Sequence, residues 1–314
     1  MSCVVFAYHD VGCRGIRVLR RLGIEVSAVY THDDDPAENV WFGSVRKTCA
    51  ELGIPVRAGA ELKDPAEHAR LRELAPRAIF SFYYRDLLPE AVLACAGRAA
   101  VNLHGSLLPR YRGRAPINWQ ILHGEREGGV TLHHMVRKAD AGDIVDQEPF
   151  AIGPDDTPTD LFARVLVAAE RVLERSAVAV VEGTAPRWIQ LESKATIFGR
   201  RRPEDGRIDW RHAAEDVRNL VRAVTKPYPG AFCFAHRERV LVWWTRHASP
   251  RAQASAAFVP GMIRREEEGI LVACGDRRFL RLERVEIGGK EGDAREFPDC
   301  LHDGGILAGI PEGA

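Results

Sequence analysis

Two polar side chains lie two residues apart at the end of an apolar run, Asn102 and His104. The run, residues 99–103 (AAVNL), is typical of a buried strand. Successive side chains of a strand point to opposite faces, so both residues lie on one face and Leu103 points into the packing. An amide can donate to a developing oxyanion, and an imidazole can move a proton between an attacking amine and a leaving nitrogen. The pair suits acyl transfer, although a capping asparagine and a structural histidine would show the same spacing.

A carboxylate follows further along the chain, Asp140 in the segment ADAGD (139–143). A carboxylate beside an imidazole favours the protonated ring and raises its pKa, so such a histidine can donate a proton as well as accept one. The alternative is that Asp140 only forms a turn before Ala-Gly. We assign Asp143 to the turn.

The segment NLHGSLLPRYRG (102–113), followed by the Asp-x-Gly at 140–142, resembles the signature of the folate-dependent formyltransferases. This family includes glycinamide ribonucleotide transformylase, methionyl-tRNA formyltransferase and the amino-sugar formyltransferases. The resemblance implies that Asn102, His104 and Asp140 form the catalytic trio. It also implies that N10-formyltetrahydrofolate is the co-substrate.

The likeness is closer to the formyltransferase part of the bifunctional polymyxin-resistance protein than to methionyl-tRNA formyltransferase. It is carried by YRGRAPINW (111–119), where tRNA enzymes usually read WRGAAPIQ, and by residues 4–15, 43–56, 79–88, 198–206 and 221–232. It implies formylation of the 4-amino group of UDP-4-amino-4-deoxy-L-arabinose, a precursor for lipid A modification in lipopolysaccharide and hence for antibiotic resistance. Methionyl-tRNA formyltransferase and a non-catalytic folate- or nucleotide-binding module remain the alternatives.

The bifunctional protein continues into an NAD-dependent decarboxylase domain. The 314 residues leave no room for that domain, and no G-x-G-x-x-G occurs. We therefore expect a stand-alone formyltransferase that uses no NAD, with decarboxylation on another polypeptide, and we expect a monomer or dimer.

The resemblance also assigns binding residues. For the folate they are Asp86, Leu87, Leu88, Arg114, Val136, Arg137, Lys138, Ala139 and Asp140. Arg114 could instead be a solvated loop charge, and the two leucines could start a core helix. For the nucleotide sugar the candidates are Tyr8, His9, Asp10, Arg201 and Arg202. Arginine suits bidentate contacts to phosphate, but an exposed basic linker explains the arginine run equally well.

The elements that position these residues alternate along the first half of the chain. Strands are predicted at 3–8, 25–30, 78–82 and 99–103, and helices at 45–52, 65–74, 89–96 and after Gly12 and Gly15. This alternation predicts an α/β fold, a Rossmann-like and mostly parallel sheet with helices on both faces. Such sheets bind ligands beyond the carboxyl ends of their strands.

The pattern changes after residue 130. Two strands are predicted at 130–135 and 144–150, then a long helix at 159–182. On the first of these strands we expect one of the adjacent His133 and His134 to be packed and the other exposed. A helix at 213–224 and several short strands then predict a small β-barrel-like, OB-like domain. The predicted organisation is a catalytic domain at 1–198, a linker at 199–206, the small domain at 207–305 and a tail at 306–314.

The composition is that of an ordinary globular protein, with 44 basic and 44 acidic side chains and 46% hydrophobic residues. The balanced charge argues against nucleic acid as a partner, because affinity for nucleic acid depends on lysine and arginine contacts to phosphate. Seven scattered cysteines without C-x-x-C, and no H-E-x-x-H, predict no metal. Neither a signal-peptide pattern nor a long uncharged run occurs, so we expect a cytoplasmic protein without membrane insertion.

Overall fold

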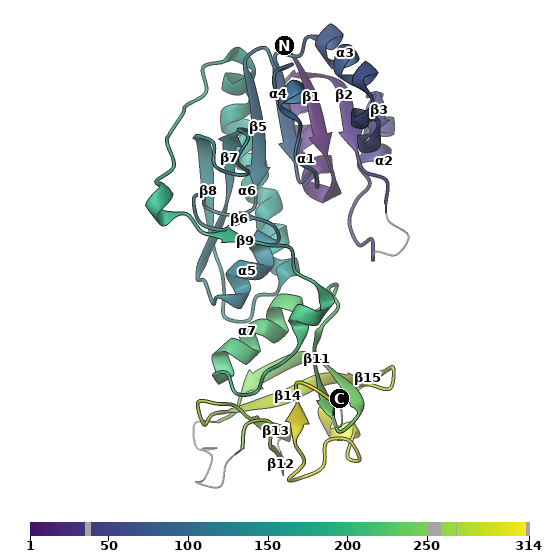
Figure 1. The fold of residues 1–314 in the computed structure, drawn as a ribbon, viewed down its shortest axis with the longest axis vertical. Coiled ribbons are helices and arrows are strands. Elements are labelled where there is room, and N and C mark those ends of the chain that lie inside the picture. Colours follow the sequence, from purple (N-terminus) through teal and green to yellow (C-terminus); the bar gives the residue numbers. More distant parts are fainter. Residues whose placement is uncertain (35–38, 250–258, 268, 312–314) are drawn as a thin grey trace. The chain divides into compact units, whose positions relative to one another are not determined.

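The computed structural model describes residues 1–34, 39–249, 259–267 and 269–311 (Figure 1). The chain forms two compact units. The first unit comprises Met1–Ile117, Glu127–Ala151 and Leu161–Gly199, and the second comprises Asn118–Arg126, Ile152–Asp160 and Arg200–Ala314. Residues 118–126 and 152–160, which the sequence places in the first domain, cluster with the second unit in the structure.

The first unit is built on a seven-stranded sheet of order β3-β2-β1-β4-β5-β7-β8. Its strands are β1 (Ser2–Ala7), β2 (Glu25–Thr31), β3 (Val56–Ala58), β4 (Ala78–Phe82), β5 (Ala99–His104), β7 (Glu127–His134) and β8 (Ile144–Ala151). The first five strands run parallel, and β7 and β8 add antiparallel at the edge beside β5. The continuous apolar runs of β1 and β4 are buried on both faces, which confirms the mostly parallel Rossmann-like sheet predicted from them.

The helices of this unit are α1 (His9–Arg21), α2 (Val45–Leu52), α3 (Pro65–Leu74), α4 (Glu90–Leu93) and α6 (Pro158–Glu182). The predicted start of α1 is wrong, because Gly12 and Gly15 lie inside the helix rather than in a turn before it. A Cβ at Gly15 would lie 2.6 Å from the ring of Phe82, and one at Gly12 would lie 2.9 Å from the Cβ of Ala7. These glycines let α1 approach the sheet closely.

Three short elements follow β5 and β8 without a clear sequence signal. Helix α5 (Pro116–Leu122) comes after the segment 102–113. Strands β6 (Arg112–Gly113) and β9 (Ile197–Phe198) form a small parallel sheet. Between α6 and β9 the chain returns along the edge of the main sheet (Figure 1), and we call residues 184–196 the strap. Trp188 exchanges both backbone hydrogen bonds with Ile144, so the strap is anchored to β8.

The second unit is a curled antiparallel sheet with one long helix, α7 (Ala214–Val224). The sheet has the order β12-β13-β14-β11-β10-β16, and β15 pairs with β14. Its strands are β10 (Ala231–Ala235), β11 (Glu238–His247), β12 (Ile263–Glu266), β13 (Gly269–Ala273), β14 (Phe279–Ile287), β15 (Lys290–Asp293) and β16 (Leu307–Ala308). The small β-rich C-terminal domain is thus confirmed as a half-barrel.

Two predicted boundaries differ from the structure. The predicted tail, 306–314, contains β16, which pairs with β10 and buries Leu307. The predicted linker, 199–206, contains the 3-10 helix η3 (Pro203–Gly206), and its Gly206 is buried. Both segments are short, and what fixes them is contact with distant residues.

Buried polar side chains of α7 explain why two early segments belong to the second unit. Arg222 donates to the carbonyls of Asp156 and Ile121, and Arg218 donates to that of Pro154. Asn118 in turn donates to the carbonyl of Ala223. Hydrogen bonds from buried guanidinium groups to backbone carbonyls satisfy both partners, so the interior retains these arginines.

Candidate active site

Asn102, His104 and Asp140 lie together at the carboxyl end of β5. Asp140 Oδ2 is 3.7 Å from His104 Nδ1, and its Oδ1 is 3.5 Å from Asn102 Nδ2. Asp140 has a φ of +53°, a left-handed conformation that is uncommon outside glycine but tolerated by aspartate. The loop after β7 thus places the carboxylate opposite the two side chains that share a face of β5.

The hydrogen bond of His104 identifies which ring nitrogen can exchange a proton. Nε2 lies 2.7 Å from the carbonyl oxygen of Tyr111. A carbonyl only accepts, so Nε2 carries a hydrogen and donates it. Proton uptake and release therefore belong to Nδ1, the nitrogen that faces Asp140.

The Asp140 carboxylate is held in its ionised form by its neighbours. Burial alone would raise its pKa, but the opposing effects prevail: the charge interaction with His104, the contacts with His133 and the backbone N–H of Gly113. Together they hold the pKa of Asp140 well below its usual range. The Gly113 N–H donates to Oδ2 at 2.8 Å. This carboxylate is therefore charged throughout the neutral range.

His133 is a site residue that the sequence prediction missed. Its partner in the β5–β7 pairing is Asn102, and its Nε2 lies 3.2 Å from Asn102 Nδ2. Nδ1 lies 2.9 Å from the carbonyl of His134, so Nδ1 carries a hydrogen. Nε2, which also lies 3.5 Å from Asp140 Oδ1, accepts from Asn102 when the ring is neutral and presents a second N–H to the carboxylate when the ring is protonated. One N–H of the Asn102 amide is thereby oriented toward His133, and the amide also donates to Asp140 Oδ1 over a long 3.5 Å contact, which a developing oxyanion could replace.

The expectation that one of His133 and His134 is exposed is wrong, since both are buried. His134 contacts the strap, with Nε2 3.3 Å from the carbonyl of Pro186 and Nδ1 3.3 Å from Arg187 Nη1. The face of β7 that carries His134 is therefore covered by the strap. The two side chains still point to opposite faces of the strand, but the sequence does not tell which elements cover each face.

The segments assigned to folate by resemblance come together at the same end of the sheet. Arg114 Nη2 donates to the carbonyl of Arg85 at 3.1 Å, and Arg137 Nε lies 4.0 Å from Glu90 Oε1. Leu88 packs beside Met135 on one core cluster. Most of the folate candidates are exposed: Asp86, Leu87, Arg114, Val136, Arg137, Lys138 and Ala139. Two of them, Leu87 and Val136, are exposed apolar side chains in the segments after β4 and β7, and such side chains offer a surface for an aromatic ligand.

The candidates for the nucleotide sugar fall into two groups. Tyr8, His9 and Asp10 lie in the first unit, where α1 begins, whereas Arg201 and Arg202 belong to the second unit. The His9 ring stacks on Phe42, and burial, followed by the charge of Arg85, lowers its pKa to about 3. His9 is thus neutral at pH 7.

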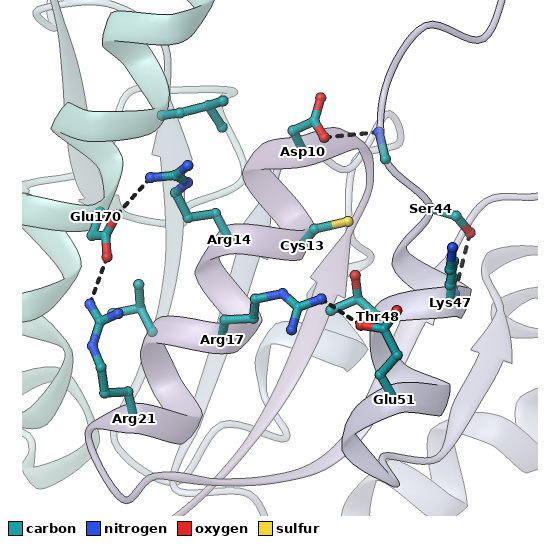
Figure 2. Close-up of a pocket in the computed structure, with 13 residues that line it drawn as sticks. Asp10, Cys13, Arg14, Arg17, Arg21, Ser44, Lys47, Thr48, Glu51 and Glu170 are labelled. Carbon is teal, nitrogen blue, oxygen red and sulfur yellow. Dashed lines mark hydrogen bonds and ion pairs between the residues drawn. The ribbon is translucent and has the colours of Figure 1, made fainter.

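Asp10 also lines a hollow of about 470 Å³ between α1, α2 and α6 (Figure 2). Its arginines are engaged by carboxylates: Arg14 pairs with Glu170 at 2.8 Å and Arg17 with Glu51 at 2.6 Å. None of the trio lines this hollow.

Within the described residues, no group of three or more histidine, cysteine, aspartate or glutamate side chains could hold a metal ion. Among the helices that the structure describes, none is long and apolar enough to span a membrane.

Comparisons with known proteins identify the family of the chain. Residues 18–177 match the profile of the formyl transferase family, and residues 200–299 match that of the formyl transferase C-terminal domain. An N-formyltransferase from Helicobacter canadensis, solved with folinic acid and dTDP-3-aminofucose, is 18% identical with a TM-score of 0.66, over 90% of this chain and 98% of that one.

Two further solved structures share the fold. The sugar 3N-formyl transferase WlaRD, with dTDP and 5-N-formyl-THF, is 17% identical with a TM-score of 0.68, over 92% of this chain and 98% of that one. HypX from Aquifex aeolicus, with tetrahydrofolic acid, is 17% identical with a TM-score of 0.63, over 96% of this chain but 47% of its own. At these identities the likeness shows the fold, and the two profile matches establish that the chain is an enzyme that belongs to the formyl transferase family.

Proposed function

We propose that the protein transfers the formyl group of N10-formyltetrahydrofolate to the amino group of a nucleotide-linked amino sugar, with UDP-4-amino-4-deoxy-L-arabinose as the acceptor. The observation that carries the proposal is the convergence of Asn102, His104 and Asp140 at the carboxyl end of β5. Two of the solved relatives hold a folate together with a thymidine nucleotide or nucleotide sugar, which supports the class of both substrates.

In this mechanism the acceptor amine attacks the formyl carbon, and negative charge develops on the formyl oxygen. The Asn102 N–H that is not directed at His133 exchanges its long 3.5 Å contact with Asp140 Oδ1 for a hydrogen bond to that oxygen. His104 Nδ1 takes the proton that the amine loses and passes it to the folate nitrogen that leaves. When Nδ1 carries the proton, the nearby Asp140 carboxylate stabilises the imidazolium.

The folate would lie against residues 86–88, Arg114 and residues 136–140. Tyr8, His9 and Asp10 remain candidates for the sugar nucleotide, as do Arg201 and Arg202. The product would be a precursor for the modification of lipid A. The enzyme would act in the cytoplasm as a monomer or dimer.

The test compares acceptors in parallel. The purified protein is incubated with N10-formyltetrahydrofolate and one of three acceptors: the UDP-aminoarabinose, dTDP-3-aminofucose or methionyl initiator tRNA. Mass spectrometry detects the mass added by one formyl group, and the Asn102→Ala variant serves as the control. We expect formylation of the UDP sugar at the highest kcat/KM. Preference for the dTDP sugar would overturn the acceptor assignment, and preference for tRNA would overturn the whole sugar assignment.

A further inference from the structure

Gln190 of the strap is buried, with 7% of its surface exposed. It lies against residues 135–143, the loop between β7 and β8 that carries Asp140 and that we call the catalytic loop. Its Nε2 donates to the carbonyl of Asp140 at 2.9 Å and to that of Gly142 at 2.6 Å. Its Oε1 accepts from Nε of Arg112 at 3.1 Å and from Nη2 at 2.8 Å. All four hydrogen bonds of this side chain are therefore accounted for.

Arg112 determines which way the amide of Gln190 faces. A guanidinium has only donors, so it requires the oxygen of Gln190, and this leaves the NH2 group toward the two carbonyls of the loop. Arg112 itself is 1% exposed, and its Nη1 donates to Glu192 at 2.8 Å. A buried arginine thus keeps the amide in the one orientation that can hold the loop.

The same arginine belongs to the second element that touches Asp140. Arg112 and Gly113 form β6, and the Gly113 N–H donates to Asp140 Oδ2. Gly113 lies so close to β9 that a Cβ there would be 2.2 Å from the carbonyl oxygen of Phe198. Asp140 is therefore held twice, through its carbonyl by Gln190 and through its carboxylate by Gly113.

We infer that Gln190 is a positioning residue for Asp140, with Arg112 fixing its orientation. The left-handed backbone of Asp140 is unfavourable by itself and needs surrounding contacts to persist. Without the two donated hydrogen bonds the loop would relax, and the carboxylate would move away from His104. Catalytic groups misplaced by about 1 Å can cost about 10² in rate. The inference rests on the proposed role of Asp140 in formyl transfer.

The variant Gln190→Glu tests this directly. A carboxylate still accepts from Arg112 but cannot donate to the carbonyls of Asp140 and Gly142, so it releases the loop while Arg112 stays paired, and it adds a negative charge beside the two carbonyls. Gln190→Met, which lacks both donors without adding charge, replaces it if Gln190→Glu does not fold. Ile189→Ala, at the exposed neighbouring position of the strap, is the matched control.

The first readout needs no substrate. Amide hydrogen exchange is measured at Gly113, whose N–H is bonded to Asp140, and at Arg114, whose N–H is bonded to Phe198. We expect exchange at Gly113 to accelerate at least tenfold in Gln190→Glu, with Arg114 unchanged and Ile189→Ala like the wild type. Equal acceleration at both amides would mean that the strap merely unfolds, and it would overturn the inference. So would no acceleration at Gly113.

The second readout is a double-mutant cycle on kcat with Asp140→Asn. If Gln190 acts through Asp140, Gln190→Glu lowers kcat about 10- to 100-fold in the wild type and less than about twofold in the Asp140→Asn background. Equal losses in both backgrounds would overturn the inference. If the wild type formylates none of the acceptors, the proposed function fails, and the exchange experiment still decides the role of Gln190.

Discussion

Replacement of Asp140 by asparagine should separate its charge from its place in the fold. The asparagine oxygen can still accept the Gly113 N–H, and Gln190 still holds the backbone carbonyl at this position. The loop should therefore keep its conformation, and folate binding should persist. What disappears is the negative charge 3.7 Å from His104 Nδ1.

The size of the effect follows from that distance. Two unit charges 3.7 Å apart interact by about 4.5 kcal/mol at an effective dielectric constant of about 20. At about 1.4 kcal/mol for each tenfold change, this corresponds to about 10³ in rate if the whole interaction is present only in the transition state. Part of it is present before reaction, so we expect kcat to fall between about 10²- and 10³-fold, with KM for both substrates nearly unchanged.

The assay is steady-state formylation at pH 7.5, together with thermal unfolding of each variant. Asp143→Asn is the matched control, because Asp143 lies in the same loop but pairs with Arg187. It should lower kcat by less than about threefold. If Asp140→Asn also stays within threefold while chemistry limits the rate, the carboxylate does not stabilise the imidazolium and the proposed mechanism is wrong.

Three further predictions concern other side chains of the site. Asn102→Ala and His104→Ala should each lower kcat about 10²- to 10³-fold with little change in KM, and the double variant should lose less than the product of the two; near wild-type kcat would make that residue structural. His133→Ala should lower kcat about tenfold, yet have almost no effect when Asn102 is already alanine, as kinetics of the double variant will show. Because burial lowers the pKa of His9 from its ordinary value of 6.5 to about 3 in the folded protein, its contribution to stability is complete above about pH 6.5 and is lost as pH falls toward 3. Urea unfolding should therefore show about 2 kcal/mol less stability at pH 5 than at pH 7.5, and His9→Phe should lack that part of the slope.

The sequence predicts most elements whose signal is local. The apolar runs at 78–82 and 99–103 are strands β4 and β5. Asp64 caps α3 by accepting from the N–H of Ala66, and Gly53 ends α2 in the left-handed conformation, as their residue types indicate. The shared face of Asn102 and His104 also follows from strand geometry, because alternation needs no knowledge of neighbouring strands.

The misses share one physical cause, which is contact between residues far apart in the chain. The sequence predicts only that one of His133 and His134 is packed and the other exposed, because nothing local says that β7 pairs with β5 and puts the His133 ring opposite Asn102. Gly12 and Gly15 suggest a turn, whereas they serve a close approach of α1 to Ala7 and Phe82. Nothing in the sequence of residues 152–160 indicates that they contact α7, although Arg218 and Arg222 of that helix donate hydrogen bonds to their carbonyls.

The strap shows the strongest conflict between local pattern and structure. Hydropathy alone would bury Ile189 and Leu191 and expose Gln190, but the structure does the reverse, with Ile189 83% and Leu191 60% exposed. Exposing two apolar side chains and burying an amide is unfavourable by itself. The arrangement persists because Gln190 makes four hydrogen bonds, and two of them go to the loop that carries Asp140. Places where a sequence breaks its own local rules tend to be functional sites. The inversion at Gln190 is thus a sign, readable only in the structure, that the strap is folded to position the catalytic loop.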